Sequence, residues 1–128
     1  MSINKYSTGP VENAVGNVGA PGESRTFFVK ALNNGHKAAR VKILLYRLNG
    51  SKVLVETRTF TLPAQSSNFR ALNVANLLQF EVQIKTDSPR VLVSGWGKNA
   101  KGRLVAAHRF VQEELIKIKK KRRHHLGA

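Results

Sequence analysis

An alternation of apolar and polar side chains over residues 78–111 constrains the fold of this chain more than any other feature. Phe80, Val82 and Ile84 alternate with polar residues, and this period of two is typical of a half-buried strand. Two turn signals, Asp87-Ser88-Pro89 and Lys98 to Gly102, divide the segment into three runs. We therefore predict a three-stranded antiparallel meander, which must bury one face against a second sheet or a helix.

Four further apolar runs predict additional strands, over residues 23–33, 38–48, 51–62 and 69–74. Asn49-Gly50 predicts a two-residue type I′ hairpin turn, since both residue types tolerate the positive φ that this turn requires. The pattern within residues 51–62 changes face, which predicts a β-bulge near Glu56 to Arg58. We expect seven strands, or eight if the N-terminal segment pairs, arranged as an antiparallel β-sandwich or jelly roll.

Two segments with weaker patterns flank this predicted β-sandwich domain of residues 23–111. The leader, residues 1–22, is rich in Gly, Asn, Ser and Pro. It is expected to be either a frayed terminus or an extended arm that docks onto a neighbouring copy. The candidate anchors of this arm are its isolated apolar residues, Ile3, Tyr6, Val11, Val15 and Val18. Residues 112–128 are expected to start a short helix at Gln112 and to continue as a solvated basic tail.

The chain carries a large excess of positive charge. Its formal net charge is +15, from 22 basic and seven acidic side chains. Six of the basic residues form a candidate polyanion contact in the tail: Lys117, Lys119, Lys120, Lys121, Arg122 and Arg123. The other 16 outnumber the seven acidic residues and give the remainder a net charge of +9. Such a field favours nucleic acid or an acidic polymer as a partner, and it also keeps a β protein in solution by repulsion.

The sequence contains no recognisable catalytic, cofactor-binding or metal-binding pattern. There is no cysteine, and His124-His125 has no Cys, Asp or Glu at metal-ligand spacing. The carboxylates are scattered, and Ser94 lacks the flanking glycines of a hydrolase nucleophile. His108 is interpreted as a core or edge histidine, and Trp96 as a core anchor between two glycines. We therefore expect no enzyme activity and no cofactor or metal.

Residues 7–22 and 78–110 resemble small β proteins of spore-forming bacilli, in which a Gly/Pro/Asn-rich leader precedes a compact β-sandwich. Val93 to Phe110 is similar to their VSxWGKNxxGxLxAAHRF-like ending. The architecture also resembles that of endospore appendage subunits, in which jelly-roll bodies stack into fibres by β-strand augmentation through an N-terminal connector. The resemblance implies a self-assembling subunit at the spore or cell surface. Because this chain has no cysteine, such a fibre would be held together without disulfides.

These observations lead to three hypotheses of function. The first is a structural subunit that self-assembles into a fibre or surface layer by docking residues 1–20 onto another copy through β-strand augmentation. The second is a module that binds a polyanion through the basic tail and body. The third, a carbohydrate-binding or catalytic jelly roll, is least favoured, since the six Phe, two Tyr and one Trp are expected mostly in the core. The sequence has no apolar run of membrane-helix length and no recognisable signal peptide, so we expect a cytoplasmic location, or a spore or cell surface if the resemblance holds.

Overall fold

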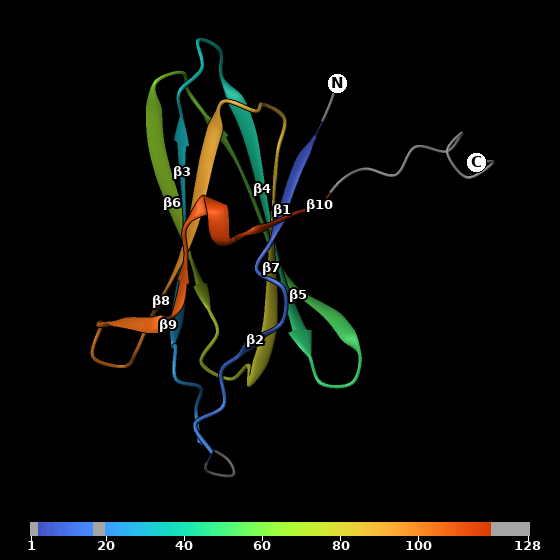
Figure 1. Ribbon diagram of the computed structural model, residues 1–128, viewed down its shortest axis with the longest axis vertical. Coiled ribbons are helices and arrows are strands. Elements are labelled where there is room, and N and C mark those ends of the chain that lie inside the picture. Colours follow the sequence, from blue (N-terminus) through green and yellow to red (C-terminus); the bar gives the residue numbers. More distant parts are fainter. Residues whose placement is uncertain (1–2, 17–19, 119–128) are drawn as a thin grey trace, which may run out of the picture.

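Two antiparallel sheets pack face to face and form a β-sandwich (Figure 1). The computed structural model describes residues 3–16 and 20–118. Sheet A has the strand order β10-β1-β7-β4-β5, with β2 also paired to β7, and sheet B has the order β6-β3-β8-β9. The strands of sheet A are β1 (Asn4–Ser7), β2 (Val11–Glu12), β4 (Ala39–Leu48), β5 (Lys52–Leu62), β7 (Gln79–Thr86) and β10 (Ile116–Ile118). Those of sheet B are β3 (Thr26–Asn33), β6 (Ser66–Asn73), β8 (Val91–Lys98) and β9 (Leu104–Phe110).

The predicted β-sandwich is thus confirmed, and the flanking segments account for the extra strands. The described residues form ten strands, where seven or eight were expected. β1 and β2 come from the leader, and β10 comes from the segment predicted as a tail. Both ends of the chain therefore contribute to sheet A.

The core lies between the sheets and consists of the inward-facing residues of each strand. Phe80, Val82 and Ile84 of β7 are fully buried, as their alternation with polar residues predicted. Phe27 of β3 meets Phe80 edge to face across the sandwich, with ring centroids 5.6 Å apart. Gly95 of β8 makes room for the Phe27 ring, since a Cβ atom there would lie 2.5 Å from its Cζ atom. The close approach of β8 to this ring explains a glycine in the middle of a buried strand.

The three-stranded meander predicted over residues 78–111 is wrong, although its three strands exist. β7 belongs to sheet A, where it pairs with β1, β2 and β4, and the chain crosses to sheet B before β8. Only β8 and β9 form a hairpin. A period of two identifies which face of a strand is buried, but it does not determine which strand lies beside it.

The loop of the β4–β5 hairpin also differs from its prediction. Leu48 pairs with Lys52, so the loop contains the three residues Asn49, Gly50 and Ser51. Of these, only Gly50 has a positive φ, at 93°. The prediction of a type I′ turn is therefore wrong, because that turn requires positive φ at both of its central residues.

The bulge predicted in β5 is present, one residue earlier than expected. Leu45 pairs with Glu56, whereas the next residue, Tyr46, pairs with Leu54. Val55 is left as the extra residue of β5, next to the predicted range of 56–58. The extra residue changes which side chains of β5 face the core, as the apolar pattern required.

The leader pairs with its own body over the described residues, which corrects the expectation of an arm that leaves the molecule. β1 lies between β7 and β10, and β2 pairs with the start of β7. Tyr6 and Val11 belong to the core, with only 5% and 4% of their surface exposed. Without these strands, the hydrogen-bonding edge of β7 would be unpaired. The boundary predicted at residue 22 therefore does not separate an arm from the sandwich.

Asn13 fixes the end of the leader to both sheets through its fully buried side chain. Its Nδ2 atom donates hydrogen bonds to the carbonyl oxygens of Ser24, Val74 and Leu77, at 3.0, 3.2 and 2.9 Å. Its Oδ1 atom accepts a hydrogen bond from the Ser24 backbone N–H at 2.8 Å. Gly22 lies so close that a Cβ atom there would be 2.1 Å from Asn13 Nδ2. One amide thus satisfies backbone groups from the leader–β3 connection and from the β6–β7 turn.

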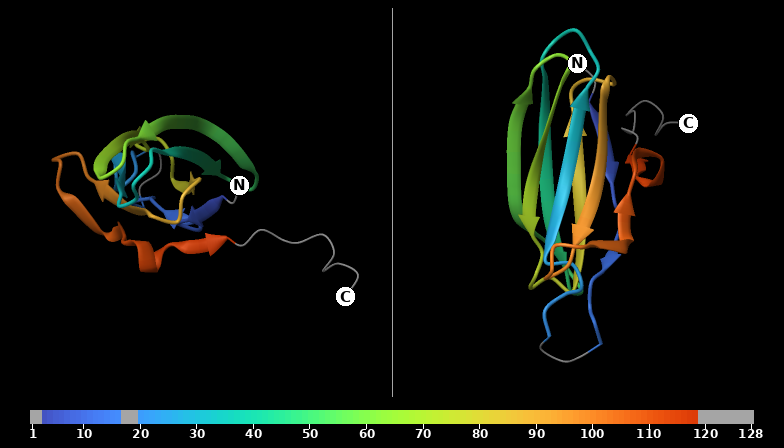
Figure 2. Two further views of the ribbon diagram at one scale, coloured as in Figure 1. Left: turned by 90° about the horizontal axis from the view of Figure 1, so that it is seen from above. Right: turned by 90° about the vertical axis from the view of Figure 1, so that its left-hand side faces the viewer.

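The C-terminal segment joins the body in the same way. A single 3₁₀ turn, η1 (Gln112–Glu114), occupies the position where a short helix was predicted. The chain then crosses from sheet B to sheet A, and β10 pairs with β1 (Figure 2). Leu115, between the two elements, is buried in the core. The predicted boundary at residue 112 therefore divides a connection between the two sheets.

The role of Asn13 predicts a large effect for a small substitution. Asn13→Ala leaves a buried N–H and buried carbonyl groups without partners, so we expect the free energy of unfolding to fall by about 2–3 kcal/mol. Urea denaturation followed by circular dichroism measures this change. Asn76→Ala, at an exposed position in the β6–β7 turn, is the control and should change stability by less than about 0.5 kcal/mol. Equal stability of the two variants would contradict this assignment.

Candidate functional site

The outer face of sheet B presents three aromatic side chains. Phe28 of β3 pairs with Trp96 of β8, and Phe69 of β6 lies on the same face beside β3. The rings of Phe28 and Phe69 are tilted against each other, with centroids 5.9 Å apart. Phe69 is 49% exposed, and the other two rings are half-buried. They face outward because their chain neighbours, such as Phe27 and Gly95, face the core.

Cationic side chains lie among these rings. The Lys98 Nζ atom lies 4.5 Å from the centroid of Phe28, and the Lys30 Nζ atom lies 5.9 Å from that of Phe69. Arg109 of β9 pairs with Trp96, which places it on the same face. We call these six residues, Phe28, Lys30, Phe69, Trp96, Lys98 and Arg109, the aromatic–basic face. Neither Lys30 nor Lys98 is among the ion pairs found within residues 3–16 and 20–118.

An open groove of about 1000 Å³ extends the aromatic–basic face toward η1. Its lining includes Lys30 and Phe69 from sheet B, and Gln112 and Glu113 from η1. The Gln112 Oε1 atom accepts a hydrogen bond from the Val93 backbone N–H at 2.8 Å. This bond holds η1 against β8 at Val93, beyond the residues of β8 that pair with β9. Gln112 therefore has a fixed position beside the groove.

The prediction that Trp96 anchors the core is wrong. Trp96 lies on the outer face, where its Nε1–H donates a hydrogen bond to Ser94 Oγ at 2.8 Å. The inward positions on either side are Gly95 and Gly97, and a Cβ atom on Gly97 would lie 2.2 Å from Ser24 Oγ. The space beside Gly95 is filled by Phe27, and the space beside Gly97 by Ser24 and His108. The large side chain of Trp96 therefore points outward. The expectation that the aromatic residues lie mostly in the core missed this face.

The outer face of sheet A carries a second basic feature, a row of lysines in register. Lys5 of β1 pairs with Lys85 of β7, and Lys85 pairs with Lys42 of β4. We call these three residues the lysine row. Burial lowers the pKa of Lys85, and the charges of Lys5 and Lys42 lower the same pKa further. Ile118, the last described residue, pairs with Lys5 at the end of the row.

Glu81, also on the outer face of sheet A, is bound to other partners. It accepts hydrogen bonds from Lys52 Nζ at 2.8 Å, Ser7 Oγ at 2.6 Å and Gln83 Nε2 at 3.0 Å. Burial raises the pKa of this carboxyl group, but the three hydrogen bonds outweigh burial and hold the pKa below its usual value. This carboxylate is therefore charged and already paired at neutral pH.

The predicted contact residues are only partly placed by the structure. Among the predicted arm anchors, Ile3 and Val15 are 59% and 41% exposed, in contrast to the two buried anchors in β1 and β2. Lys117 of the predicted polyanion contact is exposed in β10. The remaining predicted residues lie outside the described part of the chain: Val18, Lys119, Lys120, Lys121, Arg122 and Arg123.

His108 is a buried core histidine, as interpreted from the sequence. Its ring nitrogens lie 2.7 Å from Ser24 Oγ and 2.7 Å from the Glu12 carbonyl oxygen. Glu12 belongs to the leader and the fully buried Ser24 to its connection with β3, so His108 of β9 binds both segments to sheet B. Within the described ranges, no three His, Cys, Asp or Glu side chains gather as metal ligands would. The described chain also contains no helix of the length and apolarity that crossing a membrane requires.

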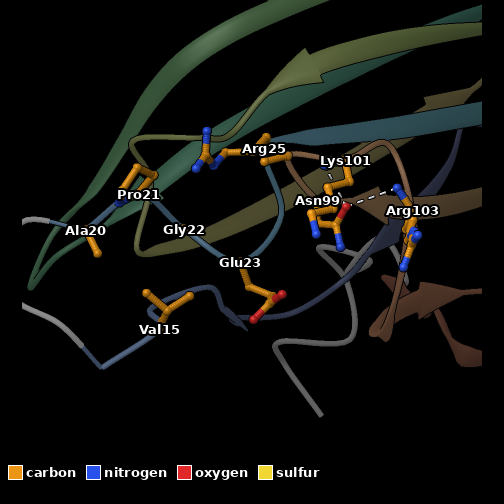
Figure 3. A pocket seen from close by; sticks show the side chains of 10 residues that line it. Val15, Ala20, Pro21, Gly22, Glu23, Arg25, Asn99, Lys101 and Arg103 are labelled. Atoms are coloured by element: carbon orange, nitrogen blue, oxygen red, sulfur yellow. Dashed lines mark hydrogen bonds between the residues drawn. The ribbon is translucent and has the colours of Figure 1, made fainter.

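A smaller pocket, of about 480 Å³, lies between the leader and the β8–β9 turn (Figure 3). Arg25, Lys101 and Arg103 line it together with one carboxylate, Glu23. Asn99 accepts hydrogen bonds from the backbone N–H groups of Lys101 and Arg103, at 2.9 and 3.0 Å, and so shapes the turn. The pocket adds to the positive charge at this end of the sandwich, but none of the described residues that line it is aromatic.

Comparisons with known proteins bear on the fold alone. No protein-family model matches the chain, and no curated protein matches it significantly. The structure is similar to the Anabaena sensory rhodopsin transducer, with a TM-score of 0.53 and 16% identity, over 80% of this chain and 93% of that chain. It is also similar to Thermotoga maritima 1070, with a TM-score of 0.53 and 11% identity, over 90% of each chain. The relation to proteins of spore-forming bacilli stays a prediction, and what the chain shares with these two structures is the fold.

Proposed function

We propose that this protein is a non-enzymatic module that binds a polyanion, and that its ligand is single-stranded nucleic acid. The observation that supports the proposal is the aromatic–basic face, where Phe28, Phe69 and Trp96 are interleaved with cations. Exposed rings on a sheet provide flat surfaces for unpaired bases, and neighbouring lysines contact the phosphates between them. The proposal keeps the polyanion class favoured by the charge and moves its main contact from the tail to the body.

The charge of the molecule favours nucleic acid over a second copy of the chain on this face. The same exposed rings could pack against another protein, and Leu32 and Leu92 add apolar area beside them. Two copies that each carry a net charge of +15 repel each other, however, and would bring Lys30 and Lys98 of both copies together. A chain of phosphates releases counterions when it binds the same lysines.

Removal of the rings tests the proposal. Phe69→Ala and Trp96→Ala should each weaken binding of a short oligothymidylate by at least about fivefold, because base stacking on an aromatic ring contributes roughly 1–3 kcal/mol. Fluorescence anisotropy at fixed salt measures the affinity. Tyr46→Ala is the matched control, since Tyr46 is a half-buried ring beneath Lys52 on the opposite sheet, 4.3 Å from the Lys52 Nζ atom. It should leave the affinity within about twofold.

Two further measurements separate stacking from simple charge attraction. Lys30→Gln should reduce the dependence of log affinity on log salt concentration by about 0.7, the contribution of one phosphate contact with a single strand. Binding of a base-free polyanion, a heparin fragment, should be unchanged in Phe69→Ala. The proposal fails if the ring variants bind the oligonucleotide as tightly as the wild type, or if heparin loses affinity to the same extent.

A second candidate function is self-assembly, and the free edge of sheet A is the observation that favours it. β5 is the last strand of that sheet, and Val53, Leu54 and Val55 near its start are 39%, 51% and 47% exposed. An exposed apolar edge strand is a template for pairing with another chain. In this version, copies pair by β-strand augmentation at β5, with the exposed leader residues Ile3 and Val15 available for further contacts.

The concentration dependence of the molecular mass tests self-assembly. Wild-type protein should form dimers or longer species at high concentration in sedimentation velocity, and Leu54→Lys should shift the equilibrium toward monomer by placing a charge on the edge. Leu78→Lys is the control, since it alters an equally exposed leucine, at 48%, in the β6–β7 turn. A wild-type protein that remains a monomer at every concentration would exclude this candidate.

A further inference from the structure

The lysine row places three positive charges side by side on adjacent strands of sheet A. Lys5, Lys85 and Lys42 are direct cross-strand partners, so their side chains leave the same face of the sheet. Partners on adjacent strands lie about 4.5–5.5 Å apart at their Cα atoms, which gives the row a length of about 10 Å. Lys42 is exposed, and Lys5 and Lys85 are half-buried. The ammonium groups are thus close enough together to contact one extended ligand.

Such an arrangement destabilises the sheet unless an anion compensates it. Like charges directly opposite one another on neighbouring strands are unfavourable, and here the central lysine has a lysine on each side. In the part of the chain that the structure describes, the ion pairs involve other cations: Lys52, Arg58 and Arg109. The carboxylate of Glu81 is engaged by Lys52, Ser7 and Gln83. Within these residues, the row is left without a carboxylate partner.

The lowered pKa of Lys85 is consistent with this geometry. Burial and the neighbouring charges of Lys5 and Lys42 both make the charged form of Lys85 less favourable. A bound anion would reverse the second of these effects, because an opposite charge favours the ammonium form.

The surroundings of the row indicate a ligand made of phosphate groups without bases. The residues at its two ends are Ile118 and Thr59, so no aromatic ring is in line with the lysines to stack on a base. In the sequence, Ile118 is followed by five further basic residues: Lys119, Lys120, Lys121, Arg122 and Arg123. Ammonium groups bind phosphates as point charges and need no planar partner.

We infer that the lysine row is a binding site for a chain of linked phosphates, of the inorganic polyphosphate type. The inference goes beyond the proposed function, because the row lies on the outer face of sheet A and the aromatic–basic face lies on the outer face of sheet B. The two faces share no residue, so each can be tested while the other is intact.

Tripolyphosphate is the probe, and the test compares two pairs of charge-removing substitutions. Lys42→Gln/Lys85→Gln removes two members of the row, and Lys37→Gln/Lys101→Gln removes two exposed loop lysines as the matched control. Calorimetric titration of the full chain at constant ionic strength should show binding to the wild type. We expect the dissociation constant to rise at least about tenfold in the row variant and to change less than about twofold in the control. Lys42→Arg/Lys85→Arg, which keeps both charges, should retain most of the affinity.

Thermal melts provide a second readout that does not depend on titration heats. Tripolyphosphate should raise the melting temperature of the wild type and the control more than sodium chloride of equal ionic strength does, and it should not do so for the row variant. In low salt without phosphate, the row variant should melt at the same temperature as the wild type or higher, because repulsion within the row is relieved. A row variant that melts at a clearly lower temperature would contradict the repulsion on which the inference depends.

The binding of oligothymidylate distinguishes this inference from the proposed function. The row variant should bind oligothymidylate with the affinity of the Lys37→Gln/Lys101→Gln control, because its aromatic–basic face is unchanged. The inference is overturned if the row variant binds tripolyphosphate as tightly as the control does, or if tripolyphosphate stabilises the wild type no more than chloride. If the ring variants keep full affinity for the oligonucleotide while tripolyphosphate still depends on the row, the proposed function fails and the phosphate site stands.

Discussion

The contact of Phe27 with Phe80 across the sandwich determines which side chains reach the outer surface. The two rings belong to opposite sheets and are both fully buried, with their centroids 5.6 Å apart. Because side chains alternate along a strand, the inward position of Phe27 directs Phe28 and, through register, Trp96 to the outside. A slip of one residue in β3 would exchange core and surface along the strand. The candidate binding surface is therefore a direct consequence of how the core closes.

The two chain ends complete the body that supports these surfaces. The leader covers the edge of β7 with β1 and β2, and the buried amide of Asn13 binds it to the connections of both sheets. The segment after β9 crosses by η1 to pair with β1. Lys5 is in line with Lys85 because β1 pairs with β7, so the lysine row exists only when the leader is docked on its own molecule. Folding of the leader and formation of the row are thus coupled.

Much of the strand pattern could be predicted from the sequence, because burial has a period of two and turns have characteristic residues. The buried face of β7 and the bulge in β5 followed from such patterns. Which strands lie side by side could not be predicted in this way. The assignment of β7 to sheet A depends on its pairing with the leader, which is distant in sequence. The aromatic–basic face was missed because a pattern around Trp96 does not reveal that Phe27 of another strand fills the space beneath Gly95. The lysine row was missed for the same reason, as its members come from three separate strands.

The lysine row and the aromatic–basic face point away from each other, because they belong to the outer surfaces of two packed sheets. A flat ligand bound to one face cannot touch the other, so the two proposed sites would bind their anions independently. A protein with two such sites joins separate polymers instead of wrapping one of them. If both proposed sites bind, cross-linked particles should form above a threshold ratio of protein to polymer, and excess protein should dissolve them by saturating each polymer separately.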